Sequence, residues 1–162
     1  MGYMLYGQND VTLDEKGRIS LPVSLRKILG DAKLIIKSSD YDNEKSLWLF
    51  PETDYLAMLE DYKKEYKKMK RITSEKLREF NRRYHNFKDV EIDKAGRIAI
   101  SQEYREYANL SKDCIVLGVG DYIEIWDKET YRKHYSESNE AFISASEEIS
   151  DKAQESKKGD EE

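Results

Sequence analysis

The sequence predicts an α+β fold in which two tandem copies of a small β-rich unit form one pseudo-symmetric domain, with peripheral helices and a helical connector. Three observations predict this fold: a segment that occurs twice, alternating apolar residues within each copy, and a helical spacing of apolar residues between the copies. The chain has 162 residues, of which 38% are hydrophobic and 38% are charged. That length allows one domain or two very small ones, and the composition indicates a modest core, whose stability neighbouring subunits can share.

The repeat consists of two blocks that occur in the same order in each half of the chain. Residues 11–29 resemble residues 90–108, and residues 47–55 resemble residues 124–131. In the first block the matched pairs, always 79 residues apart, are Asp14 with Asp93, Gly17 with Gly96, Arg18 with Arg97 and Arg26 with Arg105. The second block has an offset of 76, so we expect a shorter loop in the second copy, a change that loops tolerate well.

Each copy has the pattern of short strands around a turn, followed by a short helix. Apolar residues alternate over residues 11–13 and 19–21, which predicts two strands around a turn at residues 14–17. Pro22 is expected to end the second strand and to begin a short helix that Gly30 closes. The remaining strands are expected at residues 34–37, 46–50, 114–119 and 122–126, with a helix over residues 128–134.

The two copies are joined by a connector with the apolar spacing of two amphipathic helices. Apolar residues step by three or four along residues 56–69 and again along residues 77–87, with a break at Thr73 and Ser74. We interpret the stripe as a helix pair that packs on the sheet or on a neighbouring subunit; a ligand-binding groove is the alternative. The expected divisions are residues 5–55 and 88–135 for the two copies, 56–87 for the connector, and 136–162 for an acidic, disordered tail.

Charge is unevenly distributed along the chain. The formal net charge is −5, but residues 136–162 contain nine acidic and three basic residues and contribute about −6. The rest of the chain, with 25 basic and 24 acidic residues, is close to neutral, so contact with a polyanion has to come from local clusters. One basic cluster lies in the connector between Lys63 and Arg83. We interpret it as a solvated helix face, with a secondary phosphate-contacting surface as the alternative.

The repeated turns place cations beside a glycine. Gly17 and Gly96 allow a tight turn, and the cations projecting from the two tips are Lys16 and Arg18 in the first copy and Lys94 and Arg97 in the second. Arginine offers a planar fork for guanine edges or phosphate oxygens, and lysine offers a point charge for phosphate. Asp14 and Asp93 are expected to accept hydrogen bonds from turn amides or to hold the arginine in place. The alternative is an Asp–Arg pair that only stabilises each turn.

Other classes of site lack their usual residues. The two histidines, His85 and His134, do not have the spacing of metal ligands, and no nucleophile is paired with a base. We therefore expect neither catalysis nor a metal or cofactor site. The single cysteine, Cys114, stands among apolar residues and is expected to be buried. No segment resembles a membrane span or a signal segment, so a cytoplasmic location without membrane contact is expected.

The two turns belong to a longer pattern that resembles the MraZ family. The pattern is D-x-K-G-R-I-S-L-P-x-x-x-R at residues 14–26, repeated as D-K-x-G-R-I-x-I at residues 93–100 and followed by G-V-G-D-Y-I-E-I-W. The resemblance covers about residues 5–135, without the acidic tail, and extends to the wider AbrB-type swapped-hairpin DNA-binding superfamily. It implies two AbrB-like β-barrel repeats, a ring of many subunits, and a nucleoid-associated transcription regulator. Such a regulator would bind double-stranded DNA at short direct repeats in the promoter of its own division and cell-wall gene cluster.

The resemblance also implies which residues form the site. The expected DNA-binding set is Lys16, Arg18, Arg26, Lys27, Lys94, Arg97 and Arg105, with Asp14, Gly17, Asp93 and Gly96 structuring the turns. We expect the first tip, centred on Arg18, to be the stronger DNA reader. Ser101 stands where the family usually has proline, which allows the second short helix to begin differently. A ring-forming interaction or scaffold protein that does not read DNA is the alternative function.

Overall fold

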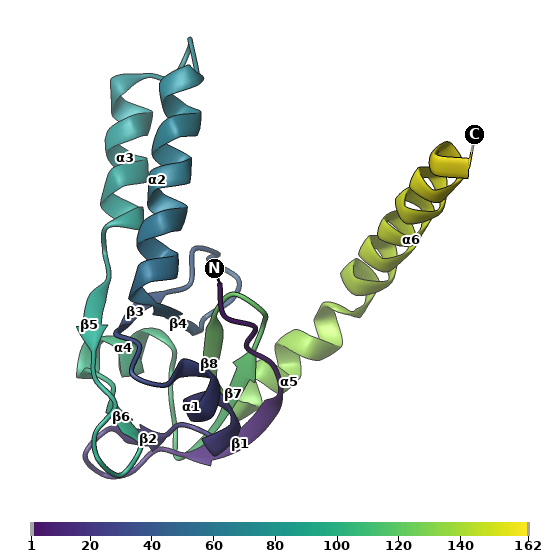
Figure 1. Ribbon diagram of the computed structural model, residues 1–162. Helices are drawn as coiled ribbons and strands as arrows, with labels where there is room; N and C mark the ends of the chain where they lie inside the picture. The colour runs from purple at the N-terminus through teal and green to yellow at the C-terminus, as the bar shows by residue number, and fades with distance from the viewer. Residues whose placement is uncertain (1, 162) are drawn as a thin grey trace. The chain divides into compact units, whose positions relative to one another are not determined.

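The computed structural model describes residues 2–161, which form an α+β fold with eight strands and six helices. The strands are β1 (Gln8–Thr12), β2 (Arg18–Ser20), β3 (Leu34–Ser38), β4 (Leu47–Pro51), β5 (Lys88–Val90), β6 (Arg97–Ala99), β7 (Asp113–Gly118) and β8 (Ile123–Asp127). The helices are α1 (Val23–Leu29), α2 (Glu52–Lys68), α3 (Ser74–Tyr84), α4 (Gln102–Tyr107), α5 (Lys128–Glu137) and α6 (Asn139–Glu161). The chain divides into two compact units, the first ending at Lys128 and the second beginning at Glu129 (Figure 1).

Each copy completes its sheet with a strand from the other copy. The order in the six-stranded sheet is β1-β7-β8-β4-β3-β5, and every neighbouring pair is antiparallel. The order reads the same from either edge when corresponding strands of the two copies are exchanged. β1 of the first copy pairs with β7 of the second, and β5 of the second pairs with β3 of the first. The predicted two-copy α+β fold is therefore confirmed, and the copies interlock as one pseudo-symmetric domain.

The strands that follow the two turns form a separate two-stranded ribbon. The opposed pairs of this β2–β6 ribbon are Arg18 with Ala99, Ile19 with Ile98, and Ser20 with Arg97. Because side chains alternate between the faces of a strand, Ile19 and Ile98 share one face, where both are 0% exposed. The two copies thus meet at the centre of the ribbon, on the pseudo-two-fold axis.

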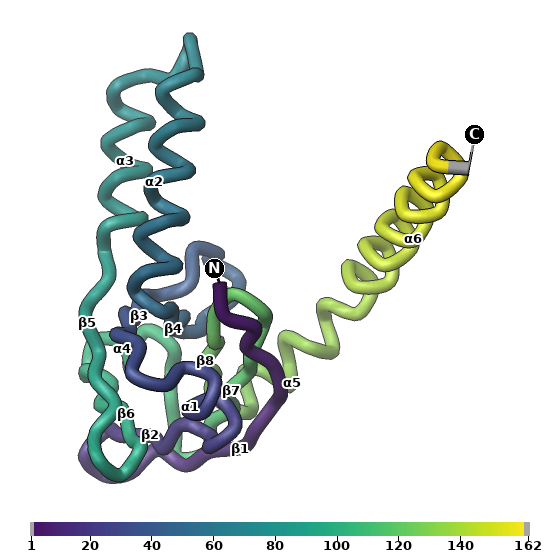
Figure 2. Tube along the Cα trace, in the orientation of Figure 1, coloured from purple at the N-terminus to yellow at the C-terminus, as the bar shows by residue number. Residues whose placement is uncertain are grey.

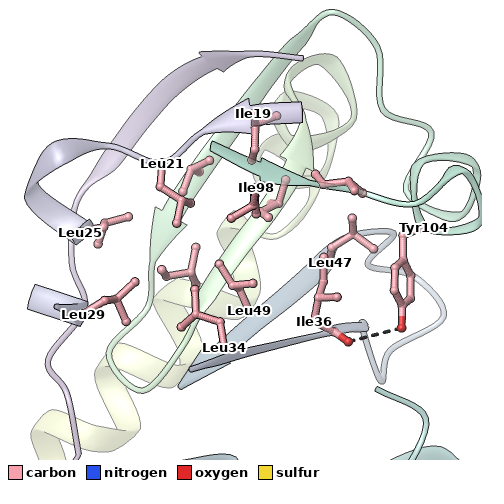
Figure 3. Packing of buried hydrophobic residues seen from close by; sticks show 14 of the residues in the cluster. Ile19, Leu21, Leu25, Leu29, Leu34, Ile36, Leu47, Leu49, Ile98 and Tyr104 are labelled. Atoms are coloured by element: carbon pink, nitrogen blue, oxygen red, sulfur yellow. Dashed lines mark hydrogen bonds between the residues drawn. The ribbon is translucent and has the colours of Figure 1, made fainter. Parts of the chain in front are cut away.

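One continuous hydrophobic core joins the buried face of the ribbon to the main sheet and to the two short helices (Figure 3). The hydroxyl of Tyr104, on α4, donates a hydrogen bond to the carbonyl of Ile36 at 3.3 Å and so ties this helix to β3. Ten of the core residues are labelled in Figure 3: Ile19, Leu21, Leu25, Leu29, Leu34, Ile36, Leu47, Leu49, Ile98 and Tyr104.

The two short helices begin differently, as the sequence predicts. α1 follows Pro22 and ends at Leu29. The next residue, Gly30, has φ of 56° and donates its N–H to the carbonyl of Arg26 at 2.9 Å. α4 instead begins after Ser101, whose Oγ accepts the N–H of Tyr104 at 3.4 Å. The side chain of Ser101 therefore accepts a hydrogen bond from a backbone amide at the start of α4. A proline at this position would have no side-chain acceptor for that amide.

The connector is a helical hairpin of α2 and α3 that extends from the main sheet (Figures 1 and 2). Thr73 marks the predicted break, since its Oγ1 accepts the N–H of Lys76 at 3.1 Å. The aromatic part of the apolar stripe packs between the two helices, where the ring centroids of Tyr62 and Phe80 lie 5.9 Å apart and those of Tyr66 and Phe80 lie 5.6 Å apart. Only the base of the hairpin packs on the sheet, through residues such as Tyr55 and Phe87, whose centroids are 5.0 Å apart.

A buried lysine lies where the base of the hairpin meets the sheet. Lys37 of β3 is 2% exposed and forms an ion pair with Asp40. Its Nζ lies 5.3 Å from the ring centroid of Trp48 and 5.1 Å from that of Tyr84. The carboxylate and the aromatic faces together offset the cost of burying the ammonium. Tyr84 is the last residue of α3, so this cluster joins the hairpin to the sheet.

Asp40→Asn is expected to lower the free energy of unfolding by about 1–3 kcal/mol, because the buried ammonium of Lys37 would lose its counter-charge. The side chain of Asp40 is 22% exposed, so water offsets part of this cost. Urea unfolding at one fixed protein concentration measures the change. Asp42→Asn, at an exposed position in the same loop, is the control. An equal effect of the two substitutions would contradict the role given to Asp40.

In the second unit, α6 continues from Asn139 to Glu161, in place of the disordered tail that the sequence predicts. The prediction weighed the low hydrophobicity of this segment, whereas Glu, Ala and Lys, which are frequent here, have high helix propensity. An ion pair between Lys152 and Glu148, one turn apart at 3.3 Å, adds to the helix. Among the described residues, no helix, α6 included, combines the length and the apolar character needed to cross a membrane.

Candidate nucleic-acid interface

The first of the two repeated turns, here called signature turns, is organised by its aspartate, Asp14. The Oδ1 atom of Asp14 accepts the N–H groups of Lys16 and Arg18 at 2.9 and 2.8 Å, and Oδ2 accepts Nε of Arg18 at 2.8 Å. The N–H of Gly17 donates to the carbonyl of Asp14 at 3.0 Å and closes the turn. Gly17 has φ of 76°, in the left-handed region that favours glycine.

The second signature turn repeats this arrangement. The Oδ1 atom of Asp93 accepts the N–H groups of Ala95 and Arg97, both at 2.9 Å, and Oδ2 accepts Nε of Arg97 at 3.1 Å. Gly96, with φ of 80°, donates to the carbonyl of Asp93 at 2.9 Å. Each aspartate therefore both accepts from turn amides and holds its arginine, so the two roles considered from the sequence occur together.

These hydrogen bonds favour the charged form of both carboxylates. The N–H of Arg18 is the main reason that the pKa of Asp14 lies below its usual value, and the N–H of Arg97 has the same effect on the pKa of Asp93. Both aspartates are therefore ionised at neutral pH, and each neutralises part of the positive charge of the arginine it holds.

Acidification is expected to loosen both turns only below the ordinary aspartate pKa of about 3.9. Because the folded-state pKa is lowered, each carboxylate contributes stability above the ordinary value and loses it as the pH falls through the folded-state value. Carboxyl ¹³C NMR of protein with labelled aspartate measures both pKa values, with Asp14→Asn and Asp93→Asn to assign the signals. A midpoint above the ordinary value for either residue would contradict the turn geometry.

The β2–β6 ribbon brings Arg18 and Arg97 onto one exposed face. Arg18 lies opposite Ala99, and Arg97 lies two residues before Ala99, so the arginines are diagonal neighbours on adjacent strands. Such neighbours are separated by about 7–8 Å. Their side chains are 28% and 34% exposed. A two-stranded ribbon fits the major groove of B-DNA, where guanine presents two acceptors to a guanidinium group.

Several cationic groups at the tips remain available for a ligand. The Nε of Arg18 is held by Asp14, but within residues 2–161 its two terminal nitrogens make no hydrogen bond. Lys16 and Lys94 are exposed and form no ion pair with any described residue. Lys27 is likewise exposed, on α1. The arrangement can present two guanidinium groups held by aspartates, with exposed lysines around them.

Arg26 and Arg105 lie against the turns instead of projecting from the tips. A β-carbon placed on Gly96 would lie 2.5 Å from Cζ of Arg26, and one on Gly17 would lie 2.8 Å from Cζ of Arg105. Both arginines are partly buried. The sequence repeat matches the two arginines with each other, but it gives no sign that each contacts the glycine of the other copy.

The basic cluster of the connector lies outside the ribbon. Figure 1 shows the hairpin of α2 and α3 extending away from the turns that precede β2 and β6. Three of its cations, Lys68, Arg82 and Arg83, are in ion pairs with carboxylates of the same helix. A solvated face and a secondary phosphate-contacting surface both remain compatible with this position. All ten basic side chains of the cluster are exposed: Lys63, Lys64, Lys67, Lys68, Lys70, Arg71, Lys76, Arg78, Arg82 and Arg83.

The remaining features do not suggest a second kind of site. Within residues 2–161, no group of three or more His, Cys, Asp or Glu side chains is placed to hold a metal ion. A surface hollow of about 550 Å³ beside α1 and β5 is lined by Arg26 and Lys33 together with four carboxylates, those of Asp31, Glu52, Asp89 and Glu91. Its acidic lining does not suit a polyanion.

Comparison with known families adds to this geometry. A family model described as "MraZ protein, putative antitoxin-like" matches residues 4–78 and 85–153. The two matched segments correspond to the two copies and together cover most of the chain. The second segment continues to residue 153, inside α6, so the expectation that the resemblance ends near residue 135 is corrected.

Proposed function

The chain belongs to the MraZ family, and we propose that it is a sequence-specific DNA-binding transcription regulator. It would bind short direct repeats in the promoter of its own division and cell-wall gene cluster, as a ring-shaped homo-oligomer associated with the nucleoid in the cytoplasm. The family description, "putative antitoxin-like", is consistent with a regulator and names no catalytic activity. The observation that supports the proposal is the exposed face of the β2–β6 ribbon, where Arg18 and Arg97 are diagonal neighbours on adjacent strands.

In the proposed mechanism, the ribbon enters the major groove with Arg18 and Arg97 facing the base edges. Each arginine is held through Nε by its aspartate, so the terminal nitrogens are oriented before DNA arrives and less conformational entropy is lost on binding. Lys16 and Lys94 reach the phosphates that flank the groove, as does Lys27. The phosphate contacts position the ribbon, and the arginine contacts read the sequence.

Assembly compensates for the weak charge of a single turn. Residues 14–18 contain two acidic and two basic side chains, so the first tip attracts DNA little over long distances. Several subunits side by side would repeat the tip at a fixed spacing. Short direct repeats would then be held by avidity, which strengthens binding without any new kind of contact.

A gel-shift assay with the DNA upstream of the chain's own gene tests the proposal directly. We expect a shift that persists at the higher of two salt concentrations, while an unrelated duplex of equal length is released. A scaffold protein that does not read DNA would assemble equally well in analytical ultracentrifugation but would not distinguish the two duplexes. That result would contradict the proposed regulator function and support the scaffold function instead.

Lys16→Ala is expected to reduce the salt dependence of DNA binding, with the slope of log K against log salt falling in magnitude by about 0.9. This change corresponds to the loss of one phosphate contact. Fluorescence anisotropy titrations at four or more salt concentrations would measure it. Lys45→Ala, which removes an exposed lysine between β3 and β4, is the control and should leave the slope unchanged. An unaltered slope for Lys16→Ala would count against a phosphate contact at this residue.

A further inference from the structure

The two arginines behind the turns cross from one copy to the other. Arg26 is on α1 of the first copy and lies against Gly96 in the turn of the second. Arg105 is on α4 of the second copy and lies against Gly17 in the turn of the first. The arrangement is reciprocal, so each turn has the guanidinium group of the opposite copy on the side where any other residue would have a side chain.

The guanidinium groups fill the space beside the glycines. The distances of 2.5 Å from a β-carbon on Gly96 to Cζ of Arg26, and of 2.8 Å from one on Gly17 to Cζ of Arg105, are shorter than real contacts of a Cβ atom. Arg26 is oriented by a hydrogen bond from its Nε to the carbonyl of Leu21 at 3.0 Å. The Nε of Arg105 is buried without a hydrogen-bond partner among the described residues, so packing on the turn orients this group.

Backbone hydrogen bonds follow the same crossed pattern. The N–H of Leu21, just before α1, donates to the carbonyl of Gly96 at 2.9 Å, and the N–H of Ile100, just before α4, donates to the carbonyl of Gly17 at 2.8 Å. Each short helix is therefore attached to the turn of the other copy both by the backbone two residues before it and by its arginine. A shift of either helix would be transmitted to the opposite turn.

We propose that Arg26 and Arg105 are positioning residues that set the orientation of the opposite turn, and through it the angle at which Arg97 or Arg18 meets DNA. The part that concerns DNA rests on the proposed function. A planar guanidinium group can lie flat on the turn, whereas the ammonium of lysine cannot, even though it has the same charge. The role therefore depends on the shape of the arginine and not on its charge alone.

Arg105→Lys in the full chain tests the proposal, because it keeps the positive charge and removes the planar guanidinium group. Hydrogen–deuterium exchange followed by mass spectrometry reports on the two turns separately. We expect amide exchange in residues 14–18 to become at least about threefold faster and exchange in residues 93–97 to stay unchanged. Arg26→Lys should give the opposite pattern. Unchanged exchange in both turns, or a change only in the turn of the same copy, would overturn the proposal.

A purely structural role of the two arginines would leave the affinity for promoter DNA unchanged, so DNA binding is the second measurement. For Arg105→Lys we expect affinity for the promoter to fall at least about fivefold and affinity for an unrelated duplex to change little, since non-specific binding depends on phosphate charge. Faster exchange with unchanged promoter affinity would overturn the positioning role. If the wild-type chain bound no promoter DNA, the proposed function would fail, while the exchange experiment would still decide on the crossed contacts.

A double-mutant cycle keeps the proposal testable if a lysine variant folds poorly. Gly17→Ala should lower the urea midpoint less in an Arg105→Ala background than in the wild type, because removal of the guanidinium makes room for the new methyl group. The strain of the positive φ at Gly17 is present in both backgrounds and cancels. Gly17→Ala combined with Arg26→Ala is the control and should be additive. Additivity in the first pair would contradict the contact.

Discussion

Replacing Arg18 with alanine is expected to weaken binding to the cognate promoter at least tenfold while the fold is retained. A bidentate arginine–guanine contact discriminates by roughly 1–3 kcal/mol, and a tenfold change in affinity corresponds to about 1.4 kcal/mol. The Nε of Arg18 is fixed by Asp14 at 2.8 Å, so the substitution removes a group whose orientation is already established. The Asp14–Arg18 pair is partly exposed, at 28% for Arg18 and 35% for Asp14, so its loss should affect stability little.

Arg97→Ala is the matched comparison, because Arg97 has the same partners in the second turn. We expect a smaller loss of promoter affinity than for Arg18→Ala, in keeping with the prediction that the first tip is the stronger reader. Anisotropy titrations at one salt concentration measure both variants, and circular dichroism with ultracentrifugation verifies their fold and assembly. Unchanged affinity in a folded Arg18→Ala protein would remove Arg18 from the DNA-binding set.

Local features of the site could be predicted from the sequence. The turns at residues 14–17 and 93–96, the helix between Pro22 and Gly30, and the break at Thr73 depend on residues close in sequence, whose conformational preferences act locally. The fold class followed from the repeat, because a duplicated unit with alternating apolar residues and an intervening helical pattern leaves few arrangements. The hydrogen-bonding role of the two aspartates could also be predicted, because aspartate side chains commonly accept hydrogen bonds from the amides of their own turn.

Contacts between the copies could not be predicted from spacing alone. A strand such as β1 has the same alternation whether it pairs within its own copy or with β7 of the other, since the pattern records only which face is buried. The contact between Arg105 and Gly17 depends on this exchange, so the sequence could present Arg105 only as another cation after a turn. The helical tail differs from its prediction because composition was weighed without helix propensity.

Ile98→Ala is expected to lower the free energy of unfolding by about 2–5 kcal/mol, the range observed when a buried isoleucine is truncated to alanine. Ile98 is 0% exposed and lies opposite Ile19 at the centre of the ribbon, where both copies contribute to the core. A domain of this size is stabilised by only about 5–15 kcal/mol, so the loss is a large part of the total. Urea unfolding at a fixed protein concentration measures it, because any assembly would make stability depend on concentration.

Ser20→Ala, at an exposed position on the same ribbon, is the control and should change stability by no more than about 0.5 kcal/mol. The crossed pairing of β1 with β7 and of β5 with β3 also predicts how the Ile98→Ala variant unfolds. Each turn is attached to strands of both copies, so residues 14–18 and 93–97 should lose protection from hydrogen exchange at the same urea concentration. If the second turn opened well before the first, the copies would be separate folding units and the interlocked core would not be the source of stability.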